Sequence, residues 1–460
     1  MYFNTIEYYG FFLVTWLFAR YGPNPGFVLL LASMLFYVVA GWFDTALISA
    51  LISLNWLLVR YVSELNRRMV LAVAINIGAL FAVKYRVFLG GSLSGDAITY
   101  VDVVLPLGIS FYTFQLLAYQ VDAARDPALR EQDPRPFALF VILFPQLIAG
   151  PIVRAAELMP QIRRLFSGNP RRLRLYSYGL FLCVLGLTKK IIFADSLAPI
   201  VDDIFFLGPA DSAQAWLGAW LFTFQIYFDF SGYSDIAIGC AYLLGIRLPR
   251  NFRTPYLSRS PREFWRRWHI TLSTWIRDYL YIPLGGGRGS QAQQLAILML
   301  VMGVAGLWHG AGANFVVWGV LWGAYIGAHR IAMAVISRSA LGVQIINTRP
   351  AVFVLWSGHL LAVVLLWVFF RAGSWAAAID YLCVMFSASP QVPALFSWTL
   401  SGCLLLLASH VVESKLERAR CLNYARRWNN SLVWGLLAGL ALWLVVLPSY
   451  THNPFIYFRF

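Results

Sequence analysis

His309 has the clearest chemical potential in the chain because of its immediate neighbours. It stands in GLWHGAGANF at 306–315, directly after an apolar stretch and among Gly306, Gly310 and Gly312. Glycine lets a ligand or another backbone approach closely, and an imidazole titrates near neutral pH and can act as a general base. Residue type and context leave a hydrogen-bonded structural histidine open as the alternative.

A second histidine, His269, lies in FWRRWHITLS at 264–273, where arginines and tryptophans adjoin it. This setting favours a cavity-lining or interfacial residue that is structural or orients a ligand, rather than a base. The six histidines follow no regular metal-ligand spacing and form no His-Glu-x-x-His motif, so we expect no metal site. His359, His410 and His452 belong to no recognisable motif of catalytic or metal-binding residues, and we expect them in the core or at an interface.

Asp229 and Asp235 lie in YFDFSGYSD at 227–235, between apolar runs. An ionisable residue inside a membrane segment costs about 3 kcal/mol on insertion scales, which makes it a functional candidate by default. The alternative is that both carboxylates are buried partners of nearby arginines and hold the fold together.

The elements that position these residues must be membrane helices. Of the 460 residues, 60% are hydrophobic and 12% are charged, whereas a soluble domain carries about 25% charged residues. The net charge of +15 is explained by Lys and Arg in cytoplasmic loops, so no nucleic-acid partner is expected. A basic cytoplasmic face also attracts anionic membrane lipids and anionic cosubstrates.

Apolar segments recur along the whole chain and predict an all-α, multi-pass membrane protein. We expect a single membrane domain over 1–460, with roughly a dozen embedded helices and re-entrant segments around a central cavity. No polar stretch is long enough to bury a core of its own. The predicted helices are 8–19, 27–43, 45–62, 69–83, 105–121, 178–193, 215–228, 295–307, 315–336, 352–370, 394–411 and 432–446.

The regular alternation of spans breaks at 137–153, FALFVILFPQLIAGPIV. The segment is shorter than the about 20 apolar residues of a span, and Pro145, Gly150 and Pro151 interrupt it. The following loop, 154–175, contains six arginines and one glutamate, so both flanks belong on the cytoplasmic side. We predict a re-entrant segment that lines a functional cavity, and an ordinary Pro-kinked span is the alternative.

A second irregular region is predicted at 225–290. Within it, 247–267 holds seven arginines and one glutamate. Residues 262–280 could form an amphipathic interfacial helix that carries Trp265, Trp268 and Trp275. The glycine-rich stretch that follows would end that helix as a turn.

Five blocks of sequence resemble the membrane-bound O-acyltransferase family, in the bacterial branch that acts in alginate, cellulose and peptidoglycan O-acetylation. They occur in order along nearly the whole chain, and the ending PFIYFRF at 454–460 is similar to that branch too. The blocks are LPLGISFYTFQ at 105–115, FPQLIAGPIVR at 144–154, QIYFDFSGYSDIAIG at 225–239, NFRTPYLSRSPREFWRRWHITLSTWIRDYLYIPLGGGRG at 251–289 and GLWHG at 306–310.

The resemblance implies an O-acyltransferase in the inner membrane of a bacterium, with His309 as the catalytic residue and His269 as a second functionally important one. It implies a cytoplasmic thioester donor, typically acetyl-CoA or an acyl carrier, and no tightly bound cofactor. The acyl group would pass across the membrane to a separate periplasmic acetyltransferase, which modifies a polysaccharide acceptor. A related branch transfers D-alanine from a carrier protein to teichoic acids.

We predict acyl transfer from a thioester to a hydroxyl, in which neutral His309 takes the proton of the acceptor. Backbone amides near Trp308 or at 310–312 could stabilise the oxyanion. Arginine forks suit the phosphates of the donor, although placement of basic loops inside the cell explains the same arginines equally well. The predicted substrate-binding residues are Trp308, Asp229, Asp235, Arg266, Arg267, Arg154 and Asn314, and Arg163, Arg164 and Arg262 are further phosphate candidates.

Two other classes of function fit parts of the pattern. A transporter that exports an acyl carrier or a polymer would also use re-entrant segments and acidic residues at membrane depth. Many transporters have paired half-repeats, and none is found in this sequence. A non-catalytic scaffold subunit of a polymer synthase would not require a histidine in a tight glycine setting.

Overall fold

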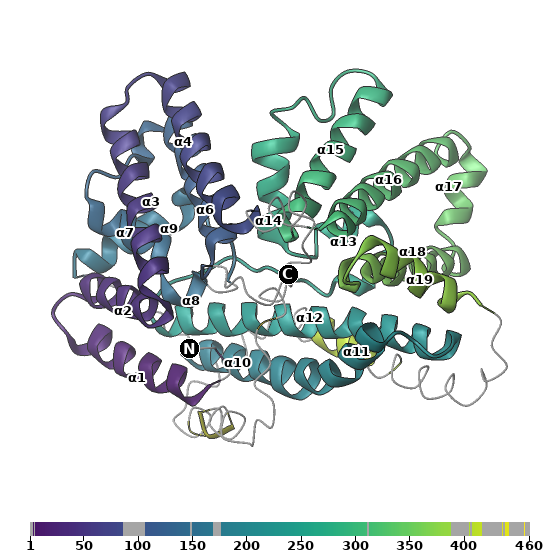
Figure 1. Ribbon diagram of the computed structural model, residues 1–460, viewed down its shortest axis with the longest axis horizontal. Helices are drawn as coiled ribbons and strands as arrows, with labels where there is room; N and C mark the ends of the chain where they lie inside the picture. Colours follow the sequence, from purple (N-terminus) through teal and green to yellow (C-terminus); the bar gives the residue numbers. More distant parts are fainter. Residues whose placement is uncertain are drawn as a thin grey trace, which may run out of the picture. The chain divides into compact units, whose positions relative to one another are not determined.

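The computed structural model describes an all-helical chain (Figure 1). It describes residue 3 and residues 5–85, 106–147, 150–168, 176–310 and 312–387, together with 404, 407–415, 435, 438–440 and 455, and no strand occurs among them. The elements, with η marking 3-10 and π-helical turns, are α1 Ile6–Tyr21, α2 Pro25–Ala40, α3 Trp42–Tyr61, α4 Leu65–Leu80, η1 Phe81–Tyr85, α6 Ile109–Arg125, η3 Pro127–Leu129, α7 Pro134–Ile142, α8 Phe144–Leu147, α9 Ala155–Phe166, α10 Tyr176–Leu187, η4 Thr188–Ala194, α11 Asp195–Leu207, α12 Ser212–Leu243, η5 Pro255–Leu257, α13 Pro261–Trp265, α14 Ile270–Ile276, η6 Arg277–Tyr281, α15 Gln291–His309, α16 Ala313–Ile336, α17 Ala340–Ile346, α18 Arg349–Arg371 and α19 Trp375–Met385.

Several of the described helices are long and apolar enough to cross a membrane, which confirms the prediction of an all-α membrane protein. The candidate spans are Trp42–Tyr61, Leu65–Lys84, Gln291–His309, Ala313–Ile336 and Arg349–Arg371. The predicted helices 394–411 and 432–446 and the C-terminal segment 454–460 lie largely outside the described residues. The total of roughly a dozen embedded helices stays a prediction.

The chain divides into two compact units. The first comprises Met1–Ile191, Phe230–Arg250 and Leu422–Phe458, and the second comprises Ile192–Asp229, Asn251–Cys421 and Arg459–Phe460. Helix α12 therefore contributes its first part to the second unit and its last part to the first. The single membrane domain over 1–460 stays a prediction.

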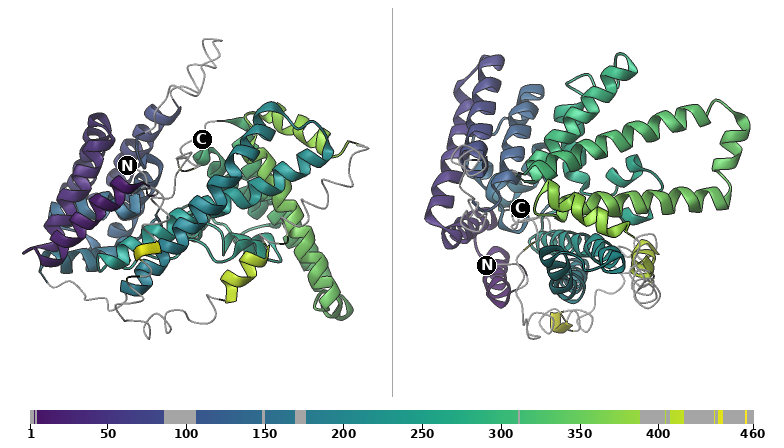
Figure 2. Two further views of the ribbon diagram at one scale, coloured as in Figure 1. Left: turned by 90° about the horizontal axis from the view of Figure 1, so that it is seen from below. Right: turned by 45° about the vertical axis from the view of Figure 1, so that its right-hand side comes forward.

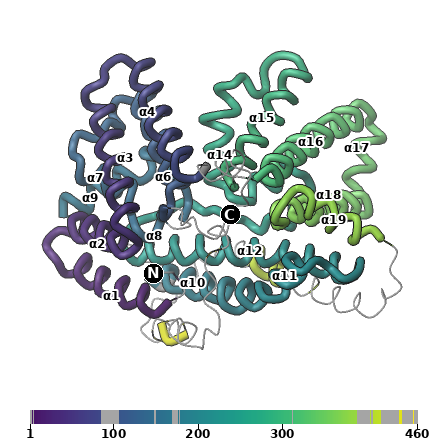
Figure 3. The backbone as a smooth tube through the Cα atoms, in the orientation of Figure 1, coloured from purple at the N-terminus to yellow at the C-terminus, as the bar shows by residue number. Residues whose placement is uncertain are grey.

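In the first unit, a buried amide network joins α3, α4 and α6, whose course Figure 3 traces. Asn55 and Asn76 exchange hydrogen bonds of 3.0 and 2.9 Å. Gln120 donates to Asn55 Oδ1 at 3.0 Å. Polar side chains hold neighbouring helices together in an apolar environment, because an amide without a partner is costly there.

The predicted irregular segment 137–153 is broken. Helix α7 is nine residues long, α8 is four residues long, and 150–153 is not helical. A helix of nine residues extends about 14 Å, which is too short for the hydrocarbon core. Gln115 donates to the carbonyl of Phe140 at 2.6 Å and so satisfies a backbone acceptor at the break. The segment is therefore not a continuous helical span, and its re-entry on the same face of the membrane stays a prediction.

The prediction of an irregular region beginning at residue 225 is wrong, because 225–243 belongs to the continuous, 32-residue helix α12. Glycines explain the difference. Gly232 faces the backbone of Gly186 in α10, and Gly239 faces that of Gly179. A Cβ atom at Gly232 would lie 2.8 Å from the Gly186 carbonyl oxygen, so the absence of side chains lets the two helices pack closely. Glycines in this stretch mark helix contact rather than irregular backbone.

The predicted interfacial helix over 262–280 is also wrong. The chain forms three short pieces there, α13, α14 and η6, and the break between the first two falls at His269, whose φ is +41°. An L-residue in the left-handed region interrupts an α-helix. Trp268 is only 1% exposed, so this tryptophan packs in a protein core and does not lie at a lipid interface.

In the second unit, α15 and α16 form an antiparallel hairpin that carries His309 at its turn, and the right-hand view of Figure 2 shows α16 and α18 joined at one end by α17. Gly306 faces the carbonyl of Phe315, and Gly319 faces the carbonyl of Met302. Because neither glycine has a side chain, the two backbones come into direct contact. This contact holds the C-terminal end of α15 against α16.

Gly306→Ala should destabilise the protein, because the added methyl group would collide with the backbone carbonyl of Phe315. Overpacking of this kind costs about 1–3 kcal/mol, and we expect a lower Tm for the detergent-purified protein. Gly303→Ala is the matched control on the same helix, since the nearest atom to its added Cβ is Val320 Cγ2 at an ordinary contact distance of 3.4 Å. Equal Tm values for the two variants would contradict the backbone contact.

Candidate active site

His309 is the last residue of α15 and is only 4% exposed. Its ring lies roughly perpendicular to those of Trp318 in α16 and Phe370 in α18, with a centroid distance of 5.2 Å in each case. The ring of Trp308 lies 4.8 Å away. Aromatic rings therefore enclose the imidazole, so that a titratable group sits in an apolar surrounding with little access for water.

His269 is fully buried between α13 and α14. Its Nδ1 lies 3.2 Å from Asn251 Oδ1, and because an amide oxygen can only accept, Nδ1 carries the proton and donates. Asn251 Oδ1 also accepts from the hydroxyl of Thr271 at 2.8 Å. Burial lowers the pKa of His269, which lies outside the candidate spans, to about 3. Asn251 thus fixes the tautomer and orientation of a histidine that is neutral at physiological pH.

Trp308 connects the two histidines. The centroid of its ring is 6.3 Å from that of His269 and 4.8 Å from that of His309. The structure therefore brings together three of the residues that the sequence singled out, although they come from two separate segments of the chain. Their catalytic and binding roles stay predictions.

Asn314 and Asp229 belong to the same unit as the histidines. Asn314, at the start of α16, donates to the carbonyls of Ala372 at 2.9 Å and Phe369 at 3.3 Å. These carbonyls lie at the C-terminal end of α18, where backbone acceptors lack partners within the helix. Asn314 therefore ties α16 to α18. Asp229 is buried in α12.

Asp235 and Arg154 belong to the other unit. Asp235 accepts from Lys189 Nζ at 2.7 Å, and Lys189 also donates to Ser231 Oγ at 2.9 Å. This carboxylate thus has a buried lysine as a partner, and pairing offsets the cost of removing both charges from water. Arg154 precedes the first turn of α9.

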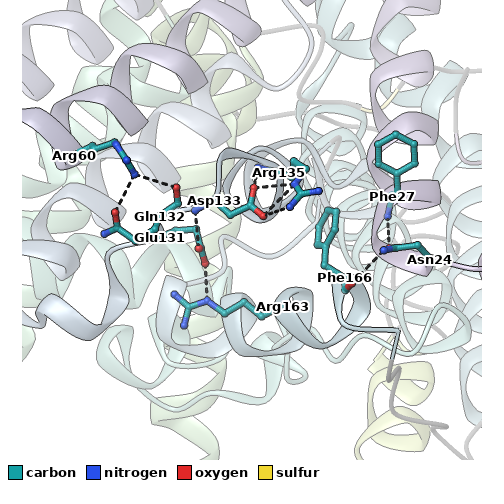
Figure 4. Close-up of polar contacts among 9 residues, drawn as sticks. All are labelled: Asn24, Phe27, Arg60, Glu131, Gln132, Asp133, Arg135, Arg163 and Phe166. Atoms are coloured by element: carbon teal, nitrogen blue, oxygen red, sulfur yellow. Dashed lines mark hydrogen bonds and ion pairs between the residues drawn. The ribbon is translucent and has the colours of Figure 1, made fainter.

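The predicted phosphate-binding arginines differ in whether they already have a partner. Arg163 forms an ion pair of 2.6 Å with Glu131, which Figure 4 shows. Arg267 pairs at 2.7 Å with the glutamate four residues before it. Arg262 and Arg266 are exposed and form no ion pair with any other residue that the structure describes. They lie four residues apart, and hence on one face of the α13 turn.

Other basic residues of the first unit also have partners around 131–135 (Figure 4). Arg60 donates to Gln132 Oε1 at 3.1 Å, and Arg135 pairs with Asp133 at 2.6 Å. The Arg135 guanidinium holds the pKa of Asp133 below its usual range. These arginines therefore have a structural explanation in this loop and need no bound phosphate.

From the sequence, His359 belongs to no recognisable motif of catalytic or metal-binding residues, but in the structure it contacts two hydroxyl groups. Its Nδ1 lies 2.9 Å from the hydroxyl of Tyr325, and its Nε2 lies 3.1 Å from Ser258 Oγ. Ser258 in turn donates to the carbonyl of Pro255 at 2.5 Å. A buried hydrogen-bond chain thus joins α16, α18 and the turn that precedes α13.

Sequence reasoning missed Asn251, Trp318 and Phe370. Asn251 and His269 lie in the same block, but no spacing rule connects residues that meet through a break in the helix. Trp318 and Phe370 look like ordinary residues of apolar spans. One signal was available for Trp318, because it follows Asn314 by four residues and therefore lies on the same face of α16.

The model of the membrane-bound O-acyltransferase family matches residues 125–370, a range that includes His269 and His309. The probable alginate O-acetylase AlgI of Azotobacter vinelandii is 39% identical over 73% of this chain and 64% of that protein. The same-named protein of Pseudomonas putida is 35% identical over 86% of this chain and 84% of its own length. The peptidoglycan O-acetyltransferase of Helicobacter pylori is 34% identical over 83% and 77%, respectively. The chain thus spans less than two thirds of the first of these relatives.

Asn251→Ala should destabilise the segment around His269, because the buried donors on His269 and Thr271 would lose their shared acceptor. Leaving buried donors without a partner costs about 1–3 kcal/mol, and a fall in Tm of the purified protein would measure the effect. Asn347→Ala is the control, since that asparagine is exposed at the end of α17, and its one side-chain hydrogen bond to a described residue goes to the carbonyl of Val343. Asn251 does not hold His269 if both variants melt at the wild-type temperature.

Proposed function

Because the chain belongs to the membrane-bound O-acyltransferase family, we propose that it is an O-acyltransferase of the bacterial inner membrane. It takes an acetyl group from a cytoplasmic thioester, acetyl-CoA, and passes it towards a polysaccharide outside the cytoplasm or to a partner acetyltransferase there. The family match over 125–370 carries this proposal. The names of the relatives, alginate O-acetylase and peptidoglycan O-acetyltransferase, support a glycan hydroxyl as the final acceptor.

His309 is the general base in the proposed reaction. It takes the proton of the acceptor hydroxyl as the oxygen attacks the thioester carbonyl carbon. The carbon–sulfur bond then breaks, and the thiolate leaves with that proton as a free thiol. The imidazolium formed in between lies at the C-terminal end of α15, where the negative end of the helix dipole stabilises a positive charge.

The surroundings of His309 support this role. Trp308, Trp318 and Phe370 enclose the imidazole, and exclusion of water protects a thioester and an acyl intermediate from hydrolysis. His269 acts as a positioning residue rather than as a second base. Its Nδ1 proton is held by Asn251, and its ring faces Trp308.

Arg262 and Arg266 bind the phosphates of the acetyl-CoA donor in the proposed reaction. The guanidinium group is planar and permanently charged, and it matches the geometry of a phosphate. Arg262 lies in α13 and Arg266 directly follows it, and both are exposed. Arg163 and Arg267, in contrast, already pair with a carboxylate. A pair of arginines on one helical face gives the phosphates of a coenzyme a site in the same unit as His309.

His309→Ala should reduce O-acetylation of the acceptor, an exported polysaccharide or peptidoglycan, by at least about a hundredfold, the typical contribution of a positioned general base. The variant is expressed in cells whose own gene has been deleted, and ester-linked acetate is measured on each purified glycan. The fraction that loses acetate identifies the acceptor.

His329→Ala is the matched control for that experiment. His329 also lies on the α15–α16 hairpin, in the last turns of α16 and outside the aromatic enclosure. Both variants must be present in the membrane at the wild-type level. Unchanged acetylation by a His309→Ala protein that inserts normally would refute the catalytic assignment.

Arg266→Gln should raise the KM for acetyl-CoA by roughly tenfold with little change in kcat, because a charged hydrogen bond to phosphate contributes about 1.5–3 kcal/mol. Thiol release by the purified protein measures both constants. Arg349→Gln, at an exposed arginine that begins α18, should leave KM unchanged. If the two variants have the same KM, α13 does not bind the donor.

A further inference from the structure

The α15–α16 hairpin carries a groove of about 230 Å³ at the end opposite His309. The first turns of α15 and the last turns of α16 line it, so it lies where two candidate spans end. Its apolar lining includes Leu295, Leu298 and Ile331, which we call the floor. Its polar lining includes Gln294, Arg330 and Arg338, which we call the rim.

A missing side chain contributes to the depth of this groove. Gly327 of α16 lies in its lining, and a Cβ atom there would touch Cδ1 of Leu295 on α15. The backbone of α16 therefore forms part of the wall. Leu295 and Ile331 are exposed large apolar residues, so the floor offers apolar surface that a hydrocarbon chain can cover.

The rim of the groove is positively charged. Arg330 donates to Gln294 Oε1, while Gln294 donates to the carbonyl of Gly289 at 3.0 Å, so the guanidinium is held in place. Arg338 is exposed and forms no ion pair with the residues that the structure describes. No acidic residue belongs to the lining in the part of the chain described. The site therefore presents two cations without a neutralising carboxylate.

We propose that this groove binds an anionic phospholipid, with the phosphate on Arg330 and Arg338 and one acyl chain on the apolar floor. Headgroup phosphates of a bilayer lie at the depth where membrane spans end, and basic residues there attract anionic lipids. Arginine adds a planar fork that fits phosphate oxygens. A soluble phosphate ester would satisfy the rim but would leave Leu295, Leu298 and Ile331 uncovered. The inference does not depend on acyl transfer.

The test uses the full-length protein purified in detergent, to which phosphatidylglycerol or phosphatidylcholine with the same acyl chains is added. Native mass spectrometry counts retained lipid molecules, and titration gives apparent affinities. Phosphatidylglycerol should bind more tightly than phosphatidylcholine. Arg338→Gln should weaken phosphatidylglycerol binding by about fivefold, the effect of one basic residue near an anionic surface, with little effect on phosphatidylcholine.

Matched variants separate the rim from the floor. Arg349→Gln removes an equally exposed arginine outside the groove and should leave both affinities unchanged. Gly327→Leu should fill the groove and weaken the binding of both lipids. Since Arg338 is exposed, its variant keeps the test valid even if Gly327→Leu does not fold.

Three outcomes would overturn the proposal. Equal affinity for the two lipids would show that the arginines do not recognise the anionic headgroup. If Arg338→Gln and Arg349→Gln weaken phosphatidylglycerol binding equally, the effect comes from the overall charge of the protein and not from the groove. Displacement of phosphatidylglycerol by coenzyme A or by inorganic phosphate at similar concentrations would assign the groove to a soluble phosphate compound instead of a lipid.

Discussion

The direct contact between the backbones of α15 and α16 is the constraint on which the candidate active site depends. Gly306 and Gly319 each face a carbonyl of the other helix, and no other residue type fits at such a distance. This contact sets the position of His309 at the end of α15 relative to Trp318 on α16. Asn314 then ties the start of α16 to α18, which brings Phe370 to the imidazole. The enclosure of His309 is thus a consequence of how two glycines and one amide arrange three helices.

The hydrogen-bonding needs of buried polar groups explain several polar residues elsewhere in the chain. In a membrane, every buried polar group needs a partner within the protein. Gln115 satisfies the carbonyl of Phe140 at the break after α7, and Asn251 satisfies His269 at the break before α14. Broken backbone is therefore found together with a side-chain amide from another segment. The two breaks persist because distant residues complete their hydrogen bonds.

The sequence predicted the parts of the structure that depend on local pattern. The apolar periodicity gave the membrane helices, and the prolines and glycines of 137–153 gave the broken segment. The pattern around His309 placed the imidazole at the end of an apolar helix, as the structure shows. The prediction failed at 225–243, because glycines that permit a close helix contact cannot be distinguished locally from glycines that break a helix.

The remaining failures depend on residues that are distant in sequence. The break at His269 requires Asn251 as an acceptor, and nothing in the pattern of 262–280 contains that information. Likewise, an arginine is available to bind a phosphate only if it does not already form an ion pair with a glutamate. Arg163 has found Glu131 across an interval of thirty-two residues, and no composition argument could separate it from Arg266.

The hydrogen-bond chain through His359 has a direction, and the direction has a chemical consequence. Ser258 has one hydroxyl proton and gives it to the carbonyl of Pro255, so its oxygen can only accept from His359 Nε2. His359 Nδ1 must then accept from Tyr325. A serine beside a histidine suggests a nucleophile and its base, but here the histidine has no lone pair to offer the serine. The pair therefore lacks the arrangement of a nucleophile and its base. The hydrogen-bond chain instead fastens the turn before α13 to α16 and α18, and the exposed arginines follow directly after that turn.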